Sequence, residues 1–173
     1  MGWVAYSVRA LSDAGAALRS SFAAVGLIPA LAAVVGVLLL ASAVIDARSR
    51  TFPNVLFAGL ACSCAAMSWA VGGWARLAGC TAASLAMGAA LTAFELGWRR
   101  VHGGAPGMGM GDVKFLAALA LWRPLDALAS FALGMLFLAC AGVVLRRGSL
   151  PLLPFAVPAF VVLQIARALG IAM

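Results

Sequence analysis

The sequence predicts an all-α membrane protein of about six transmembrane helices, preceded by an amphipathic helix at the membrane surface. Of the 173 residues, 65% are hydrophobic and only 10% are charged. A soluble domain of this size would expose too much apolar surface to water. The apolar residues also gather in long stretches separated by short basic connections, which is typical of multi-pass membrane proteins.

The first 25 residues are predicted to lie along the membrane surface rather than across it. Apolar residues recur there at helical spacing, at Val4, Val8, Leu11, Leu18 and Phe22. Polar and charged residues take the other side, as in an interfacial helix; a frayed tail is the alternative. The chain therefore divides into an interfacial segment, residues 1–25, and a single transmembrane domain, residues 26–173.

Six apolar stretches follow, at about 26–45, 55–72, 77–96, 113–122, 125–145 and 152–169. A helix needs about 20 residues to cross a bilayer. The fourth stretch has only ten residues, so it can cross only if the glycine-rich run before it also lies within the membrane. Pro151, Pro154 and Pro158 interrupt the start of the sixth stretch. We therefore expect six spans, with the fourth and the sixth irregular at one end.

The basic residues predict how the protein is oriented. With six spans, one side of the membrane holds seven of them, namely Arg48, Arg50, Arg99, Arg100, Lys114, Arg146 and Arg147. The other side holds five, Arg9, Arg19, Arg76, Arg123 and Arg167. The richer side is predicted to be cytoplasmic, so both termini face outward. The net charge of +7 is explained by these connections and does not indicate nucleic-acid binding.

Two of the five acidic residues, Asp46 and Asp112, lie at the ends of apolar stretches on that same side. A carboxylate in or near the hydrocarbon is costly and is a candidate functional group. Two carboxylates held close share one proton, so one can take a proton from water while the other donates to a carbonyl or a leaving amine. The pair therefore indicates an aspartyl hydrolase that acts on a membrane-embedded substrate.

Asp112 belongs to the run 107–114, Gly-Met-Gly-Met-Gly-Asp-Val-Lys. Glycines at 107, 109 and 111 would permit close backbone approach and positive φ, so that an extended substrate could pair with this segment. The alternative is a flexible linker that ends in a helix-capping aspartate. Lys114 either snorkels to the surface or tunes Asp112. Glu95 precedes Arg99 by four residues, and we expect a structural ion pair there.

No metal or cofactor is expected. The four cysteines lie in apolar stretches without a C-x-x-C pair, and His102 is the sole histidine. Zinc sites of the common types need more such ligands at closer spacing.

Three motifs together resemble those of the type IV prepilin peptidase family of bacterial inner (cytoplasmic) membranes. The first is Ile45-Asp46 followed by Pro53-Asn54, and the second is the G-x-G-D signature of residues 109–112 with its following lysine. The third, residues 153–158, is similar to a proline-phenylalanine motif that opens the family's last span. The chain lacks the family's N-terminal methylating region and its paired cysteines. It therefore resembles the small, peptidase-only members of tight-adherence pilus systems, and no N-methylation is expected.

The resemblance implies that Asp46 and Asp112 are the catalytic pair of a membrane aspartyl endopeptidase. Such an enzyme would remove the short basic leader of Flp-like type IV prepilins after a glycine, on the cytoplasmic face. The candidate substrate-binding residues are Gly109, Gly111, Lys114, Pro53, Asn54, Pro154 and Phe155. The implied partners are a prepilin and the lipid bilayer, with no nucleic acid and no cofactor; the oligomeric state is left open. The alternative is a small transporter or channel subunit that uses Asp46 and Asp112 as a proton relay.

Overall fold

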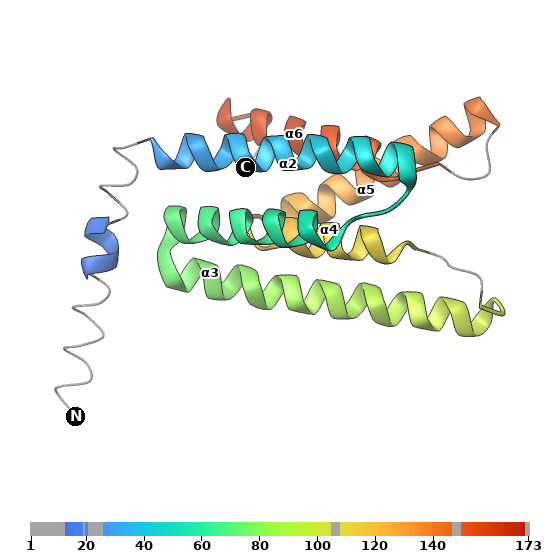
Figure 1. Ribbon diagram of the computed structural model, residues 1–173, viewed down its shortest axis with the longest axis horizontal. Coiled ribbons are helices and arrows are strands. Elements are labelled where there is room, and N and C mark those ends of the chain that lie inside the picture. Colours follow the sequence, from blue (N-terminus) through green and yellow to red (C-terminus); the bar gives the residue numbers. More distant parts are fainter. Residues whose placement is uncertain (1–12, 19, 21–25, 105–107, 147–149, 172–173) are drawn as a thin grey trace.

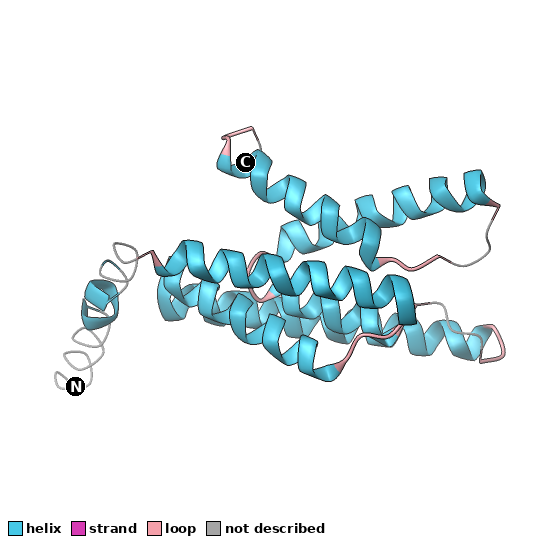
Figure 2. Cartoon of the chain, turned by 45° about the horizontal axis from the view of Figure 1, so that its top comes forward, coloured by secondary structure: helices cyan, strands magenta, loops and turns pink. Residues whose placement is uncertain are grey.

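The computed structural model describes residues 13–18, 20, 26–104, 108–146 and 150–171. Its main helices are α2 (Leu27–Ser49), α3 (Asn54–Val101), α4 (Met110–Ala120), α5 (Pro124–Leu145) and α6 (Leu153–Ala168). No strand occurs within the described ranges, and Figures 1 and 2 show a bundle of helices. The predicted all-α fold is confirmed.

The long element α3 is a helical hairpin. Gly73 lies inside it with φ 68° and ψ −161°, a conformation that glycine tolerates and other residues rarely adopt. Figure 1 shows the chain reversing at this point, so that the two halves of α3 run side by side in opposite directions. The reversal falls between the second and third predicted stretches, 55–72 and 77–96.

The helices make this a multi-pass membrane protein. In the described part of the chain, α2, α3 and α5 are long and apolar enough to cross a membrane. The apolar helix α6 has 16 residues and α4 has 11, both shorter than a full span. Large hydrophobic side chains are exposed along the outside, as a lipid-facing surface requires; examples are Val37, Leu85, Leu136, Phe137 and Val143. The count of six spans stays a prediction.

The predicted surface helix over residues 1–25 falls mostly outside the described residues. Residues 13–18 are helical, which agrees with the periodicity there. Their position relative to a membrane is not tested, so this segment also stays a prediction.

The short helix α4 lies at the centre of the bundle. Its side chains Phe115, Leu116 and Leu119 are almost completely buried, and α4 packs against α3 and α5. Leu39 of α2 and Phe160 of α6 belong to the same core. Most of α4 is therefore enclosed by its neighbours, and its partly exposed first turn carries Asp112.

Helices α5 and α6 cross in close contact. A Cβ atom added at Gly134 of α5 would lie 2.9 Å from the Cα atom of Ala156 in α6, closer than atoms can pack. Pro154 stands in the first turn of α6, where its missing N–H costs no helical hydrogen bond, and Pro158 lies one turn further along. The crossing fixes where α6 begins, at the end of the bundle where α2 ends and α4 begins.

Candidate active site

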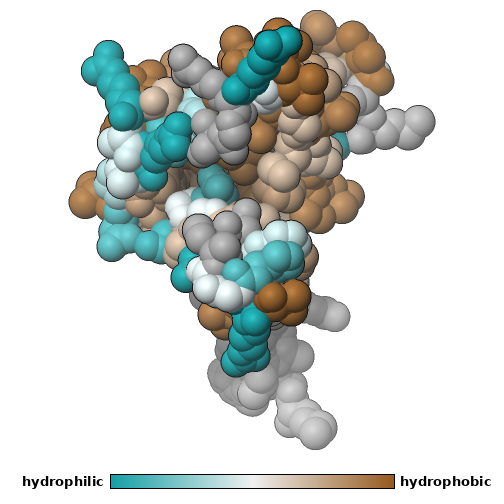
Figure 3. Space-filling view, turned by 90° about the vertical axis from the view of Figure 1, so that its right-hand side faces the viewer, coloured by the Kyte–Doolittle hydropathy of each residue, from teal (hydrophilic) through white to brown (hydrophobic). Residues whose placement is uncertain are grey.

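A cavity of about 680 Å³ opens at this end of the bundle, and it is called the aspartate cavity below. It is lined by Asp46, Arg50, Thr51, Phe52, residues 108–112, Lys114, Phe131, Met135, Leu138 and residues 150–153. Figure 3 views this end, where hydrophilic side chains gather on the face and hydrophobic ones lie around it. The two aspartates, far apart in the sequence, therefore meet at one cavity.

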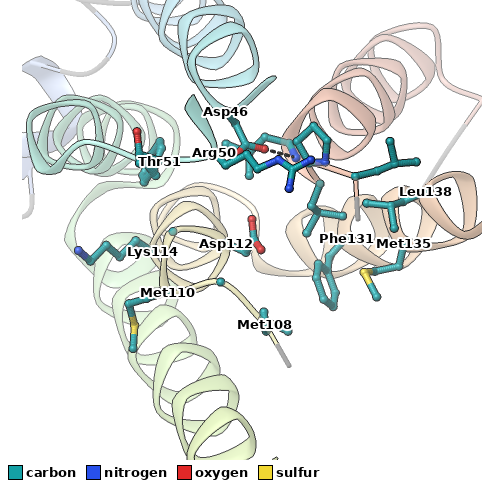
Figure 4. A pocket seen from close by; sticks show the side chains of 17 residues that line it. Asp46, Arg50, Thr51, Met108, Met110, Asp112, Lys114, Phe131, Met135 and Leu138 are labelled. Atoms are coloured by element: carbon teal, nitrogen blue, oxygen red, sulfur yellow. Dashed lines mark hydrogen bonds between the residues drawn. The ribbon is translucent and has the colours of Figure 1, made fainter. Parts of the chain in front are cut away.

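Asp46 lies in the last turn of α2 and is 8% exposed. Its Oδ2 atom accepts a hydrogen bond from the backbone N–H of Leu153 at 3.1 Å, a contact drawn in Figure 4. The positive charge of Arg50, one turn later, also acts on this carboxylate. Both neighbours stabilise a negative charge on Asp46. The hydrogen bond also ties the end of α2 to the beginning of α6.

Asp112 lies in the first turn of α4, and its carboxyl group is half-buried. Figure 4 shows this group pointing into the space between α4 and the end of α2. The charge of Asp46 acts directly on it. Two carboxyl groups that repel across a partly buried space are costly to ionise together, so they titrate as a pair.

The two glycines of the G-x-G-D run are required by close packing. A Cβ atom at Gly109 would lie 3.1 Å from Asp112 Oδ2, and one at Gly111 would lie 3.0 Å from the Cβ atom of Phe52. Gly109 has φ −69°, which any residue can adopt. Gly109 and Gly111 are not among the described residues with positive φ, and the expected pairing of an extended substrate with this segment stays a prediction.

Lys114 has a role that neither sequence alternative included. It points away from Asp112 on the other side of α4 (Figure 4), and its Nζ atom donates to Asn54 Oδ1 at 2.9 Å. Pro53 stands just before the first residue of α3 and Asn54 is that residue. Lys114 lines the cavity, but Pro53 and Asn54 are not among its lining residues. The contact joins the start of α4 to the start of α3 at the mouth of the cavity.

Pro154 and Phe155 lie outside the aspartate cavity. They line a second, apolar hollow of about 470 Å³ between α5 and α6, together with Leu133 and Phe137. Leu153, the residue just before them, is the one that reaches Asp46. Their assignment as substrate-binding residues stays a prediction.

The sequence did not predict two features of the site. The first is the apolar wall that α5 supplies through Phe131, Met135 and Leu138. The periodicity of a span cannot distinguish a cavity-lining face from a lipid-facing one. The second is the electrostatic interaction between Arg50 and Asp46. The sequence did not predict it, because an arginine at this position is also expected in an ordinary basic loop.

Glu95 supplies a further support for the site. The predicted ion pair with Arg99 is confirmed, with Nε and Oε1 2.6 Å apart. The other oxygen, Oε2, accepts the backbone N–H of Met108 at 2.6 Å. Glu95 is only 1% exposed, so this carboxylate holds the segment before Gly109 against α3. The position of Glu95 inside an apolar stretch was the sequence feature that could have predicted this supporting role.

In the part of the chain that the structure describes, no group of three or more His, Cys, Asp or Glu side chains could hold a metal ion. The expectation that the reaction needs no metal stays a prediction.

A family model, the type IV leader peptidase family, matches residues 33–157 and so includes both aspartates. Comparison with curated proteins and with solved structures gave no match. The chain belongs to the type IV leader peptidase family and is therefore a membrane peptidase. This membership favours a hydrolase over the proton-relay transporter.

Proposed function

We propose that the protein is an aspartyl endopeptidase of the bacterial inner membrane that removes the basic leader of Flp-like type IV prepilins. One observation carries the proposal: Asp46 and Asp112, 66 positions apart, line the same cavity in a chain of this family. The cut follows a glycine and takes place on the cytoplasmic face, where the predicted orientation puts the cavity.

The reaction needs one ionised and one protonated carboxyl group. The ionised group takes a proton from a water molecule as the water oxygen bonds to the scissile carbonyl carbon. The protonated group donates to the carbonyl oxygen and, as the C–N bond breaks, a proton passes to the leaving amine. Arg50 and the N–H of Leu153 stabilise negative charge on Asp46 against the larger cost of its burial, and either carboxyl group can be the ionised member of the pair.

The cavity lining suits a leader that ends where an apolar helix begins. The lining combines polar side chains, including Arg50 and Lys114, with apolar side chains of α5, including Phe131 and Leu138. A substrate glycine beside Gly109 would let two backbones approach without crowding the carboxyl groups. The substrate's apolar helix would then leave the cavity along α5.

The test uses the full chain, purified and reconstituted in lipid with a candidate prepilin, and the masses of the products are measured. The wild type is expected to release the leader. Asp46→Asn and Asp112→Asn should each lower the cleavage rate about 10²- to 10⁴-fold, the contribution of general acid–base groups. Asp13→Asn, at an exposed position in the N-terminal part, is the matched control and should cleave normally.

If Asp46→Asn or Asp112→Asn cleaves at the wild-type rate, the pair is not catalytic. A bulky residue in place of the substrate glycine should also slow cleavage strongly. Equal rates for the glycine and bulky substrates would contradict the proposed substrate and leave the peptidase class untouched.

A further inference from the structure

A cluster of arginines lies toward the end of the bundle opposite the aspartate cavity. Arg123 precedes α5, Arg167 lies near the end of α6, and Arg76 follows the reversal of α3. Figure 1 shows the reversal of α3 and the ends of α4 and α6 away from the end where α2 stops. The charges of Arg76 and Arg167 both act on Arg123, so the three guanidinium groups are close neighbours.

One carboxylate, that of Asp126, pairs with two of these arginines. Asp126 Oδ1 accepts from Arg167 Nη2 at 2.7 Å, and Asp126 Oδ2 lies 3.8 Å from Arg123 Nε. Gln164 Nε2 also donates to Oδ2, at 3.0 Å. Arg76 reaches only a backbone oxygen, that of Trp122, at 3.4 Å. Among the residues that the structure describes, three permanent cations therefore gather around one carboxylate, which leaves two positive charges in excess.

This excess positive charge is only weakly screened by water, because the arginine side chains are largely buried. The side chain of Arg123 is 27% exposed and that of Arg167 is 33% exposed. Buried donors also outnumber acceptors, since the Nε atoms of all three arginines and the indole N–H of Trp122 make no hydrogen bond. Folded proteins rarely leave several such donors together without an acceptor. The cluster therefore offers several donors that an anion with several oxygen atoms could accept from.

The surroundings indicate which anion this is. Large apolar side chains are exposed near the same helix ends: Trp74, Leu125 and Leu169 are 67%, 76% and 69% exposed. Trp74 also contacts the Trp69 ring, and tryptophans gather at the level where lipid headgroups meet the hydrocarbon. A guanidinium fork matches the oxygens of a phosphate group, and the apolar side chains match acyl chains.

We propose that Arg76, Arg123 and Arg167 form a binding site for the phosphate group of an anionic phospholipid, in the leaflet opposite the aspartate cavity. A lipid of net charge −1 offsets part of the excess charge, whereas the cationic headgroup of a zwitterionic lipid is repelled. The free ends of Arg76 and Arg123 hold the phosphate, and Asp126 keeps Arg167 in place beside them.

The test measures lipid binding to the purified full chain by native mass spectrometry, with phosphatidylglycerol and phosphatidylcholine as probes. Wild type should bind phosphatidylglycerol at least about tenfold more tightly, a difference of about 1.4 kcal/mol, because both lipids carry the phosphate group but only phosphatidylcholine adds a cation that the arginines repel. Arg76→Gln should remove most of this preference, because it deletes one charge without leaving Asp126 unpaired. Arg100→Gln, an exposed arginine at the other end, is the control and should bind like wild type.

Equal binding of the two lipids by wild type would overturn the proposal, and so would an equal loss in Arg76→Gln and Arg100→Gln. Inorganic phosphate is the third probe; if it displaces phosphatidylglycerol at equal concentration, the site takes a free anion and the lipid assignment is wrong. Photo-crosslinking of the wild type with a photoreactive phosphatidylglycerol maps the bound lipid directly and does not require that a variant folds. Labelling near residues 74–76 or 123–126 supports the site, and labelling only near residues 99–114 contradicts it.

Discussion

At the residue scale, the site depends on how little room surrounds Asp112. The nearest atoms to the open faces of Gly109 and Gly111 are the carboxyl oxygen of Asp112 and the Cβ atom of Phe52. A methyl group at either position would push on one of these groups. Gly109 therefore leaves room for the carboxyl group of Asp112, and Gly111 leaves room for Phe52.

Replacing either glycine by alanine should lower the cleavage rate. Gly109→Ala pushes on the carboxyl group itself by a few tenths of an ångström and should cost less than the roughly 100-fold that a shift of about 1 Å in a reacting group can cause. Gly111→Ala displaces Phe52 and should have a smaller effect. Gly36→Ala, with no atom within 4 Å of the added methyl, is the control and should cleave like wild type. Unchanged cleavage by Gly109→Ala, measured as kcat at saturating prepilin, would show that this packing does not position Asp112.

The pair should also give the reaction a bell-shaped dependence on pH. The reactive form holds one proton between the two carboxyl groups, so activity falls when the second proton binds and again when the first is lost. The measurement is kcat/KM from about pH 4 to pH 9, a range that lies above the ordinary aspartate value of about 3.9. A rate that stays constant over this range would contradict a shared proton.

At the scale of elements, α4 is placed by its core packing and by contacts on both sides of its first residue. Core packing of Phe115 and Leu116 holds the helix, and Lys114 bonds its first turn to Asn54 of α3. Glu95 holds Met108 from the other side. The segment that carries Asp112 is thus fixed by α3, although α3 supplies no carboxylate to the cavity.

The hydrogen bond between Glu95 and the N–H of Met108, called the tether here, can be tested by two substitutions of Glu95. Glu95→Gln keeps an oxygen that can accept the N–H of Met108, whereas Glu95→Ala leaves that donor without its partner, at a cost of about 1–3 kcal/mol. We expect the glutamine variant to keep most of its activity and the alanine variant to lose about tenfold or more in kcat.

Unfolding temperatures of the same samples separate a lost tether from a lost fold. Equal losses of activity in the two variants would point to the ion pair with Arg99 rather than to the tether. Retention of full activity by both would show that the segment before Gly109 is held by other contacts.

At the scale of the whole molecule, the two ends of the bundle differ in chemistry. One end carries the aspartate cavity, and the other carries the cluster of Arg76, Arg123 and Arg167 around Asp126. The exposed apolar surface between them faces lipid. The balance of basic residues predicts that the aspartate end is cytoplasmic.

Cysteine labelling checks this orientation. Single cysteines replace the exposed residues Arg100 and Trp74 in a chain without its four native cysteines. A membrane-impermeant maleimide added to intact cells should label position 74 and not position 100, and permeabilised cells should label both. The reverse pattern would overturn the orientation, although the two aspartates would still share one side.

The sequence by itself predicted the all-helical fold and that Asp46 and Asp112 lie at the same end of the spans. Both follow from local properties, because apolar length sets a span and the number of spans between two residues sets their sides. The tertiary structure decided the contacts between elements: Leu153 on Asp46, Glu95 on Met108, Lys114 on Asn54, and the arginines around Asp126. These contacts depend on the crossing angle of the helices and on how each helix is rotated about its axis. When every face of a span is apolar, the sequence periodicity does not determine either quantity. The sequence of an apolar span does not show which face contacts protein and which contacts lipid. The partners of each polar side chain are therefore known only from the tertiary structure.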